Sequence, residues 1–340
     1  MKHRGVALGF SGGMDSITAA QRLLSDGYDV KAVTLDMLGE QSMVESAASS
    51  AREVGVEHYV RYVGEDFQSL IIDYFAQSYM SGYTPAPCTL CNPLIKWRHL
   101  ASVADELSVE AIATGHYFRI EQYNNRYYVA RAADTTKDQS YYLWGLPHSL
   151  LERIITPMGD VIKADVKRNF VGKGESMSLC FLQGQSYRDF LSQHYPMALQ
   201  KGDIVNMSGV IVGQHDGIAF YTIGQKRGLD IVGEQRCIVA IDAASNRLIV
   251  GDNADLCHAT LVIKQCNIID IDEVLSASDI TVIIRGIGRN PQGYARRVEP
   301  IEGGFRILLD DPAWAAAKGQ PVVLYRQNRV IGGGILSDSY

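Results

Sequence analysis

The sequence predicts an α/β protein with a parallel-sheet domain at its N-terminus, a small mixed central domain and a β-rich C-terminal domain. Three observations indicate this class. Strand-like and helix-like segments alternate along the first third of the 340-residue chain, the alternation ends near residue 185, and from about residue 256 short strand-like segments follow one another. A chain of this length is expected to form two or three domains. We place them at residues 1–185, 186–255 and 256–340.

The first third of the chain carries the signature of a parallel sheet. Apolar residues at helical spacing, such as Ile17, Ala20 and Leu24, predict a helix directly after the first strand. Strands that alternate with helices form sheets covered on both faces, and ligands bind at the carboxyl ends of such strands. The residues that directly follow strands, 11–16 and 115–116, are therefore expected at the binding edge. The expected strands are 6–10, 30–37, 58–63 and 110–114, and the expected helices are 15–24, 44–54, 67–80 and 93–107.

The pattern changes in the rest of the chain. Residues 117–132 predict a hairpin that turns at Asn124-Asn125, with helices following through Asn169. One helical stretch, 187–195, precedes short β-like runs separated by turn signals. From about residue 256 every segment is predicted to be a strand, which indicates a small barrel or sandwich. These strands are 261–269, 280–287, 305–309, 322–325 and 330–336.

Composition narrows the class of protein. Hydrophobic residues make up 46% and charged residues 21% of the chain, which excludes a largely disordered chain, a collagen-like repeat and a disulfide-dense miniprotein. No apolar run approaches the ~20 residues of a membrane helix. The N-terminus lacks the long apolar segment of a signal peptide, so we expect a cytoplasmic protein with no membrane partner.

The charge distribution argues against bulk binding of nucleic acid. The net charge is −6, and no DNA partner is expected. A local exception lies between Asp279 and Glu299, where every charged residue is an arginine. This arginine strip is either a solvated sheet face or a set of phosphate contacts. Its members are Arg285, Arg289, Arg296 and Arg297.

A glycine-rich turn between the first strand and the first helix is the strongest local signal. Its glycines let the backbone approach an anion without obstruction by Cβ, the helix start offers N–H groups, and two serines add hydroxyl donors. The motif is neither a Walker A loop nor a G-x-G-x-x-G fingerprint. The structural alternative is a simple turn with Asp15 as a helix cap. The motif reads Gly9-Phe10-Ser11-Gly12-Gly13-Met14-Asp15-Ser16.

Six cysteines are present, and in a cytoplasmic protein they are not expected to form structural disulfides. Cys237, Cys257 and Cys266 lie in strand-like apolar runs, where inert thiols are the usual case. Cys88 and Cys91 form a CxxC motif. This spacing by itself is compatible with zinc, redox chemistry, an iron–sulfur centre or chance.

The SGGxDS sequence at residues 11–16 resembles the PP-loop of ATP pyrophosphatases. These enzymes cleave ATP between the α- and β-phosphates and adenylate an oxygen of their substrate. The resemblance implies that the loop holds the pyrophosphate portion of ATP together with Mg²⁺. It also implies that Leu35, at the end of the second strand, contacts the adenine through its backbone and that Gly115 lies near the nucleotide.

Further motifs resemble one family, the tRNA-specific 2-thiouridylases (MnmA/TrmU), and they follow in the family's order over nearly the whole chain. The resemblance implies a PP-loop domain of the adenine nucleotide α-hydrolase-like type, a small central domain and a C-terminal β-barrel. It further implies ATP-dependent 2-thiolation of a tRNA uridine, at the wobble position. The motifs are Pro87-Cys88-Thr89-Leu90-Cys91-Asn92, Ala113-Thr114-Gly115-His116-Tyr117, Lys137-Asp138-Gln139-Ser140-Tyr141, Leu179-Cys180-Phe181-Leu182, residues 221–229, Gly319-Gln320 and Gly332-Gly333-Gly334.

The family's chemistry implies roles for three residues. Uracil C2 is a poor electrophile, and adenylation of its oxygen makes AMP the leaving group. By motif position, Cys180 resembles the cysteine that carries a persulfide, and Cys91 resembles the nucleophilic, disulfide-forming partner. Asp138 is expected to position or activate the base. Cations favour a thiolate, and Lys96 and Lys173 lie near these cysteines in sequence.

Other positions resemble the family's tRNA contacts, and they favour the phosphate-contact interpretation of the arginine strip. Structural explanations stay open for some of them. His116 could cap the next segment, residues 137–139 could be a surface turn, and Cys180 could be a packed core thiol. The implied tRNA contacts are Ala86, Pro87, Cys88, His116, Lys137, Asp138, Gln139, Arg285, Gly286 and Gln320.

The sequence departs from the family at Cys88, where many members carry an acidic residue. The change adds a third cysteine to Cys91 and Cys180, and three thiolates around an open iron would suit a [4Fe–4S] cluster that binds sulfide. A zinc site has no evident fourth ligand. The segments 37–46 and 166–173 are also shorter than usual, and Lys173-Gly174-Glu175-Ser176 differs from the family's motif.

Three functions are compatible with these observations. The first is tRNA uridine 2-thiolation, with tRNA and either a sulfur-donor protein or sulfide as partners. The second is a diverged paralogue that thiolates another tRNA position or binds tRNA without thiolation; the intact loop and the retained Cys91 and Cys180 argue against loss of thiolation. The third is amidation, which leaves both cysteines without a role. No glycine motif of the S-adenosylmethionine type indicates methyl transfer.

Overall fold

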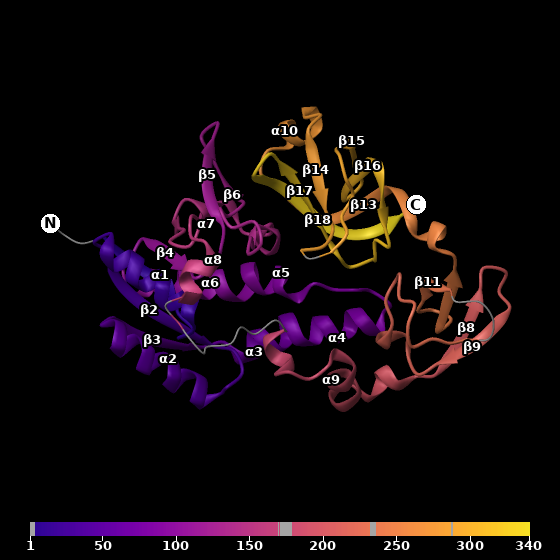
Figure 1. Cartoon of the computed structure of the whole chain (residues 1–340), viewed down its shortest axis with the longest axis horizontal. Coiled ribbons are helices and arrows are strands. Elements are labelled where there is room, and N and C mark those ends of the chain that lie inside the picture. The colour runs from indigo at the N-terminus through magenta and orange to yellow at the C-terminus, as the bar shows by residue number, and fades with distance from the viewer. Residues whose placement is uncertain (1–3, 169, 171–178, 232–235, 287) are drawn as a thin grey trace. The chain divides into compact units, whose positions relative to one another are not determined.

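The computed structural model of the chain describes residues 4–168, 170, 179–231, 236–286 and 288–340 (Figure 1). Two compact units alternate along the sequence. The first comprises residues 1–71, 88–177 and 328–331, and the second comprises residues 72–87, 178–327 and 332–340. Lys173 and the rest of the 173–176 motif lie outside the described residues.

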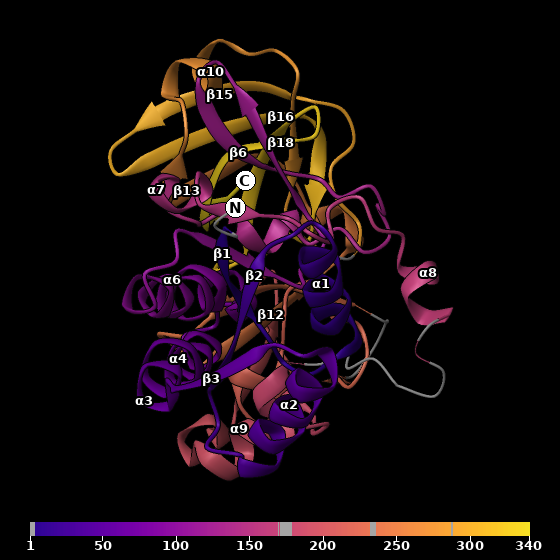
Figure 2. The ribbon, with the colours of Figure 1, turned by 90° about the vertical axis from the view of Figure 1, so that its left-hand side faces the viewer.

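The first unit is built around a parallel sheet with the strand order β3-β2-β1-β4-β7. The central strand β1 pairs in parallel with β2 and β4. Helices α1 and α2 cover one face, and α6 covers the other (Figure 2). The predicted α/β class and its parallel N-terminal sheet are confirmed. The elements are β1 (Gly5–Gly9), α1 (Met14–Ser25), β2 (Asp29–Asp36), α2 (Gln41–Val54), β3 (Glu57–Tyr62), α3 (Gly64–Phe67), α6 (Trp97–Glu106), β4 (Ala111–Thr114) and β7 (Ile154–Ile155).

A hairpin and short helices complete the first unit. The hairpin turns where predicted, because Asn124 and Asn125 adopt φ values of 47° and 57°. At the start of β18, Arg329 pairs with Ala130 within this unit. The remaining elements are β5 (Arg119–Tyr123), β6 (Arg126–Ala130), η3 (Ser140–Leu143), α7 (His148–Leu151) and α8 (Lys163–Arg168).

The prediction of only helices between the hairpin and Asn169 is wrong at one place. Ile154 and Ile155 form β7, which pairs in parallel with β4 at the sheet edge. A strand of two residues is too short for its periodicity to be visible in the sequence.

Two of the expected helices contain π-helical turns. Residues 64–80 form α3, η1 (Gln68–Ile72) and α4 (Asp73–Met80). Residues 87–106 form α5 (Pro87–Cys91), η2 (Asn92–Lys96) and α6. Such turns widen the helix and occur often at functional sites. Here the second one follows Cys91 directly.

The second unit contains two sheets, with the strand orders β10-β9-β8-β12-β11 and β14-β17-β18-β13-β16-β15. The β-rich C-terminal region is as predicted. Among the described residues, no helix has both the length and the apolar character needed to span a membrane. The strands are β8 (Gly202–Asn206), β9 (Ile211–His215), β10 (Asp230–Ile231), β11 (Cys237–Asp242), β12 (Arg247–Gly251), β13 (Cys257–Ile268), β14 (Ile280–Ile283), β15 (Ala295–Ile301), β16 (Gly304–Trp314), β17 (Pro321–Arg326) and β18 (Arg329–Ser339).

One helix interrupts the region that was predicted to be all strand. Helix α10 (Ile271–Ser276) begins after Asp270, whose carboxylate accepts hydrogen bonds from the N–H groups of Asp272 and Glu273 at 3.1 and 3.3 Å. This is a side-chain N-cap. The other helical elements of the unit are η4 (Cys180–Leu182), α9 (Tyr187–His194), η5 (Pro196–Leu199), η6 (Ile218–Phe220) and η7 (Asn253–Leu256).

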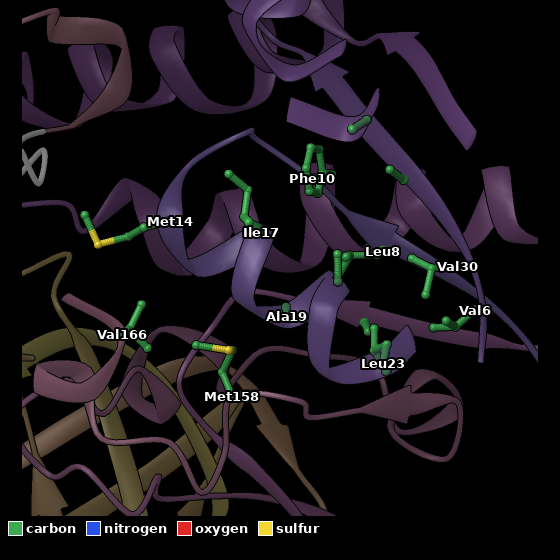
Figure 3. Close-up of a cluster of buried hydrophobic side chains, with 14 of the residues drawn as sticks. Val6, Leu8, Phe10, Met14, Ile17, Ala19, Leu23, Val30, Met158 and Val166 are labelled. Atoms are coloured by element: carbon green, nitrogen blue, oxygen red, sulfur yellow. The ribbon is translucent and has the colours of Figure 1, made fainter. Parts of the chain in front are cut away.

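The core of the first unit joins the central strand to α1 and α8. Val6 and Leu8 of β1 are buried together with Met14 and Ile17 of α1. Figure 3 shows Met158 and Val166 beside α1, and both belong to the same buried cluster. The segment that leads into α8 is therefore fixed against the helix that follows the glycine-rich turn.

We predict that Leu8→Ala destabilises the first unit by about 2–5 kcal/mol, because it leaves a cavity in the central strand. The matched control is Leu24→Ala on the exposed face of α1, which is expected to change stability little. The measurement is chemical denaturation followed by circular dichroism. Equal effects of the two substitutions would contradict this placement of the core.

Candidate active site

The glycine-rich turn forms the connection between β1 and α1. Gly13 occupies the N-cap position of α1 and has no side chain with which to satisfy the first-turn N–H groups. The hydroxyl of Ser11 accepts a hydrogen bond from the N–H of Gly13 at 3.3 Å, and the hydroxyl of Ser16 lies 3.4 Å from that of Ser11. The helix N-terminus and both hydroxyls therefore face the same turn, which is the arrangement of an anion site.

Two glycines allow the backbone to approach closely around this turn. Gly12 has φ +71°, and a Cβ there would lie 2.9 Å from the Cα of Ala47. A Cβ on Gly115 would lie 2.9 Å from the backbone N of Ser16, so the residue after β4 packs against the start of α1. The turn leaves no room for side chains, and its donors are N–H and O–H groups. These features fit the phosphates of a nucleotide.

Asp15 does not cap α1, so the structural alternative for the turn is not what the structure shows. Its carboxylate accepts a hydrogen bond from the hydroxyl of Tyr117 at 2.7 Å. The ammonium of Lys163 lies 2.6 and 2.7 Å from the two carboxylate oxygens. Sequence reasoning missed Lys163, because it is 148 residues away along the chain and no motif marks it.

Phe10 and Leu35 lie at the carboxyl edge of the sheet. The N–H of Phe10 donates to the carbonyl of Val33 at 2.8 Å, which extends the pairing of β1 with β2. Leu35 is half-buried near the end of β2, where it pairs with Arg61 of β3. This edge is where a nucleotide is expected, and contact of Leu35 with adenine stays a prediction.

His116 follows β4 and is held as a neutral imidazole. Its Nδ1 lies 2.8 Å from the hydroxyl of Thr114, and its ring lies beside that of Trp97. Burial, and secondarily the charge of Lys96, lowers the pKa of His116 to about 3. The capping role considered above is therefore replaced by a side-chain contact within the same turn.

Residues 137–139 are tied to the His116 segment rather than projecting as a surface turn. Gln139 accepts a hydrogen bond at its Oε1 from the N–H of Tyr117, and its own N–H donates to the Tyr117 carbonyl, at 2.9 and 2.8 Å. The carboxylate of Asp138 has 8% exposed surface and accepts from the N–H of Ala132 at 3.0 Å. It also accepts from the hydroxyl of Ser140 at 2.7 Å. These contacts favour a positioning role for Asp138.

The CxxC motif lies on α5. Cys91 is buried and Cys88 is half-buried. The amide of Asn92 donates to the carbonyl of Cys88 at 2.9 Å and to that of Tyr142 in η3 at 3.1 Å. Since Ser140 begins η3 and contacts Asp138, a continuous hydrogen-bonded path connects the 137–139 segment with the cysteine helix.

Cys180 is exposed, which excludes the packed core thiol considered above. It begins the short helix η4, and the two residues after it are buried. The ring of Phe181 packs edge-on against Phe75 and Phe190, with centroids 5.2 and 5.4 Å apart. The apolar neighbour therefore anchors the segment and leaves the thiol at the surface.

The structure does not support the predicted iron–sulfur cluster, nor the alternative of a zinc site. Over the described ranges, which include all six cysteines, no group of three His, Cys, Asp or Glu side chains could hold a metal ion. Cys88 and Cys91 lie one turn apart on α5. None of these six described cysteines forms a disulfide, so the predicted Cys91–Cys180 bond is not present in this structure.

The arginine strip has mostly structural contacts. Arg285 donates to the carbonyls of Arg289 and Trp314 at 3.2 and 3.1 Å, and also to that of Ala315. The remaining strand arginines of the strip, on β15, each lie near a carboxylate. These contacts favour the sheet-face interpretation, and phosphate contact by Arg285 stays a prediction.

The other implied tRNA contacts lie in turns and at an element's start. Gln320 accepts a hydrogen bond from the N–H of Ala317 at 3.0 Å within a turn. Gly286 is exposed directly after Arg285, and Ala86 is half-buried before Pro87, the first residue of α5. No contact with RNA follows from these positions alone.

The parallel sheet, the glycine-rich turn at its carboxyl edge and the donors around it define an ATP-utilising enzyme of the PP-loop type. Profiles of three protein families match the chain in sequence. They are described as the tRNA methyl transferase HUP domain over residues 4–184, the tRNA methyl transferase PRC-barrel domain over residues 188–252 and the aminomethyltransferase beta-barrel domain over residues 260–336.

The chain belongs to the tRNA-specific 2-thiouridylase family, as its motifs predict. It is 36% identical to tRNA-specific 2-thiouridylase MnmA 1 of Bacteroides fragilis, with 99% of this chain and 98% of the relative covered. It is 31% identical to tRNA-specific 2-thiouridylase MnmA 2 of Clostridium botulinum, with 98% of each covered. Among solved structures, the chain resembles a crystal structure described as a predicted subunit of tRNA methyltransferase from Methanocaldococcus jannaschii. The TM-score is 0.33 and the identity 20%, and the match covers 49% of this chain and 74% of the other.

We predict that His116 makes stability depend on pH. Its folded pKa is lowered to about 3, below the value of about 6.5 expected in the unfolded chain. The unfolded state therefore gains a proton first as pH falls, and stability is lost between about pH 6.5 and pH 3. His116→Gln is expected to flatten this dependence. The measurement is the free energy of unfolding at pH 7.5 and pH 5.5; equal slopes in both proteins would contradict it.

We predict that Asp138→Asn costs about 1–3 kcal/mol of stability. The substitution replaces one accepting carboxylate oxygen by an NH₂ group, which then faces the N–H of Ala132 or the hydroxyl of Ser140, both of which donate. The control is Asp165→Asn, whose carboxylate is exposed on α8. Both are measured by chemical denaturation. A loss of stability no larger than the control's would contradict the positioning role of Asp138.

Proposed function

We propose that the protein is an ATP-dependent tRNA uridine 2-sulfurtransferase that adenylates O2 of a uracil and then replaces it with sulfur from a cysteine persulfide. The proposal extends to the wobble uridine, which is the family's substrate position. The observation that carries it is the nucleotide turn of residues 11–16 in a chain that also retains an exposed Cys180 and a buried Cys91.

The nucleotide turn supports the activation step. O2 of the uracil attacks the α-phosphate of ATP, and the bond to pyrophosphate breaks. The N-terminus of α1 and the hydroxyls of Ser11 and Ser16 would stabilise the negative charge on the departing pyrophosphate. Mg²⁺ bound with the nucleotide would neutralise further phosphate charge, and the hydroxyl oxygen of Ser16 is a ligand of the type it prefers. The Asp15 carboxylate is already engaged by Lys163 and Tyr117.

The two cysteines support the sulfur-transfer step. Exposure of Cys180 suits a thiol that must receive the terminal sulfur of a persulfide on a donor protein, with the donor's thiolate as the leaving group. In the proposed step, the terminal sulfur of the Cys180 persulfide attacks C2 of the adenylated uracil and AMP leaves. The thiolate of Cys91 then attacks the Cys180 sulfur, which releases 2-thiouridine and leaves a Cys91–Cys180 disulfide. An external thiol reductant must reduce that disulfide before the next cycle.

The segment around His116 supports recognition of the tRNA substrate. Internal hydrogen bonds connect His116–Tyr117, residues 137–139 and the cysteine helix α5, which supports a common role for these residues, as the family resemblance implies. Because Nδ1 of the neutral His116 is hydrogen-bonded to the Thr114 hydroxyl, its Nε2 would make one hydrogen bond to a base or a ribose. This arrangement is suited to holding an unpaired nucleotide.

We predict that Cys180→Ser lowers formation of 2-thiouridine at least about a hundredfold, because a hydroxyl cannot carry a persulfide. The assay is mass spectrometry of tRNA nucleosides after incubation of the purified protein with unmodified tRNA, Mg-ATP and polysulfide, whose sulfane sulfur can be transferred to a thiolate to form a persulfide. tRNA binding, measured by filter retention, is expected to be unchanged. The matched control is Cys257→Ser, which alters another exposed thiol of the same unit.

The outcomes separate the competing functions. Thiolation that survives in Cys180→Ser would overturn the persulfide route. Absence of thiolation by the wild type despite tRNA binding would favour the diverged paralogue, and a thiolated nucleoside at another position would reassign the substrate. Cys88→Ala is expected to retain activity, since the persulfide route does not use that thiol.

A further inference from the structure

Lys163 forms a buried ion pair with the nucleotide turn, and no motif or role assigned above includes it. The residue is 5% exposed, and its ammonium contacts both carboxylate oxygens of Asp15. The ring of Tyr117 lies 5.6 Å from the same ammonium, and its hydroxyl donates to Asp15. The pair thus sits in the first turn of α1, beside the hydroxyls of Ser11 and Ser16.

The position of Lys163 is fixed by two further contacts. Its backbone N–H donates to the carboxylate of Asp134 at 2.9 Å. Hydrogen bonds from the Thr136 hydroxyl and from this N–H hold the pKa of Asp134 below its usual range, so it remains ionised. One turn further along α8, Val166 packs into the core beside Met14 (Figure 3). These two contacts hold the segment that carries Lys163, and so keep its side chain at Asp15.

The electrostatic consequence follows from where Asp15 lies. An uncompensated carboxylate in the first turn of α1 would oppose the binding of any anion that the N–H groups and hydroxyls attract. The ammonium of Lys163 compensates the charge of the Asp15 carboxylate at hydrogen-bond distance in a partly buried environment. A buried ion pair is by itself weak support for stability, since desolvation offsets most of its attraction. Its effect on anion binding is the larger consequence.

We propose that Lys163 is a positioning residue of the nucleotide site: by neutralising and orienting Asp15, it makes the turn selective for the pyrophosphate portion of ATP. The inference rests on the proposed use of ATP by this turn. Lys163 and Tyr117 together hold the Asp15 carboxylate in one position, so that its charge is compensated when a phosphate binds to the turn. Because the effect is on phosphate charge, it grows with the number of charges on the ligand.

The test is direct binding of three ligands by calorimetry, in the presence of a chelator so that no metal contributes. The ligands are inorganic pyrophosphate, α,β-methylene-ATP, which is not cleaved between these phosphates, and AMP. We predict that Lys163→Met weakens pyrophosphate and the ATP analogue at least about tenfold, because an unpaired carboxylate then faces them. AMP is expected to change by less than about twofold, and Lys163→Arg is expected to retain most of the affinity.

A double variant keeps the inference falsifiable. If Lys163 acts by neutralising Asp15, then Asp15→Asn combined with Lys163→Met removes both charges and restores most of the pyrophosphate affinity that Lys163→Met alone loses. Failure of this rescue overturns the inference. Equal weakening of AMP and pyrophosphate, or no weakening of either, also overturns it.

Two controls separate this inference from the proposed function and from general damage. Lys31→Met removes another partly buried lysine of the same unit, which pairs with Asp29 and Glu57 at the start of β2, and it is expected to leave all three affinities unchanged. If the wild type binds none of the three ligands even when excess Mg²⁺ replaces the chelator, the proposed function fails. If it binds them only with Mg²⁺, the variants are compared under that condition. If the wild type binds them and Lys163→Met does so equally well, only the inference about Lys163 fails.

Discussion

The close approach of backbone to backbone around the start of α1 is the constraint on which the candidate site depends. Gly12 and Gly115 each come within 2.9 Å, measured from an added Cβ, of atoms in a neighbouring segment. Only glycine permits that approach, and it brings the residue after β4 against the first turn of the helix. Hydrogen bonds then extend this contact, because the Tyr117 hydroxyl donates to Asp15 of α1 and the Tyr117 N–H donates to Gln139.

The parallel sheet and the nucleotide turn could be predicted from the sequence because their information is local. Strand and helix periodicity, the glycine-rich turn and the Asn124-Asn125 hairpin each occupy a few consecutive residues, and the structure contains all of them. The errors lie where local signals are weak. β7 has two residues, and α10 depends on a single capping side chain, Asp270, within a β-rich region.

The site residues show the same division between local and distant information. The turn of residues 11–16 can be recognised because its motif is contiguous in the sequence. The positions of Lys163 and Asp138 in the site depend instead on contacts between segments that are separate in the sequence. Arg285 illustrates the converse, since a cationic residue in an acid-free stretch was expected to meet phosphate. In the structure its guanidinium donates to backbone carbonyls, which the sequence did not indicate, and contact with phosphate stays a prediction. A sequence reports which charges exist, and only the fold reports which of them are already satisfied.

The contrast between the two cysteines links the fold to the order of chemical steps. Cys91 is buried at the end of α5, next to Asn92, and its burial limits access to thiol reagents and sulfur donors. Cys180 is exposed, and the residue after it, Phe181, packs against Phe75. In the function that we propose, a sulfur atom that arrives from outside would be received by the exposed Cys180. The buried Cys91 would act only after a substrate or a rearrangement brings an electrophilic sulfur to it. The difference in burial is compatible with the roles that the motif positions imply, which stay a prediction.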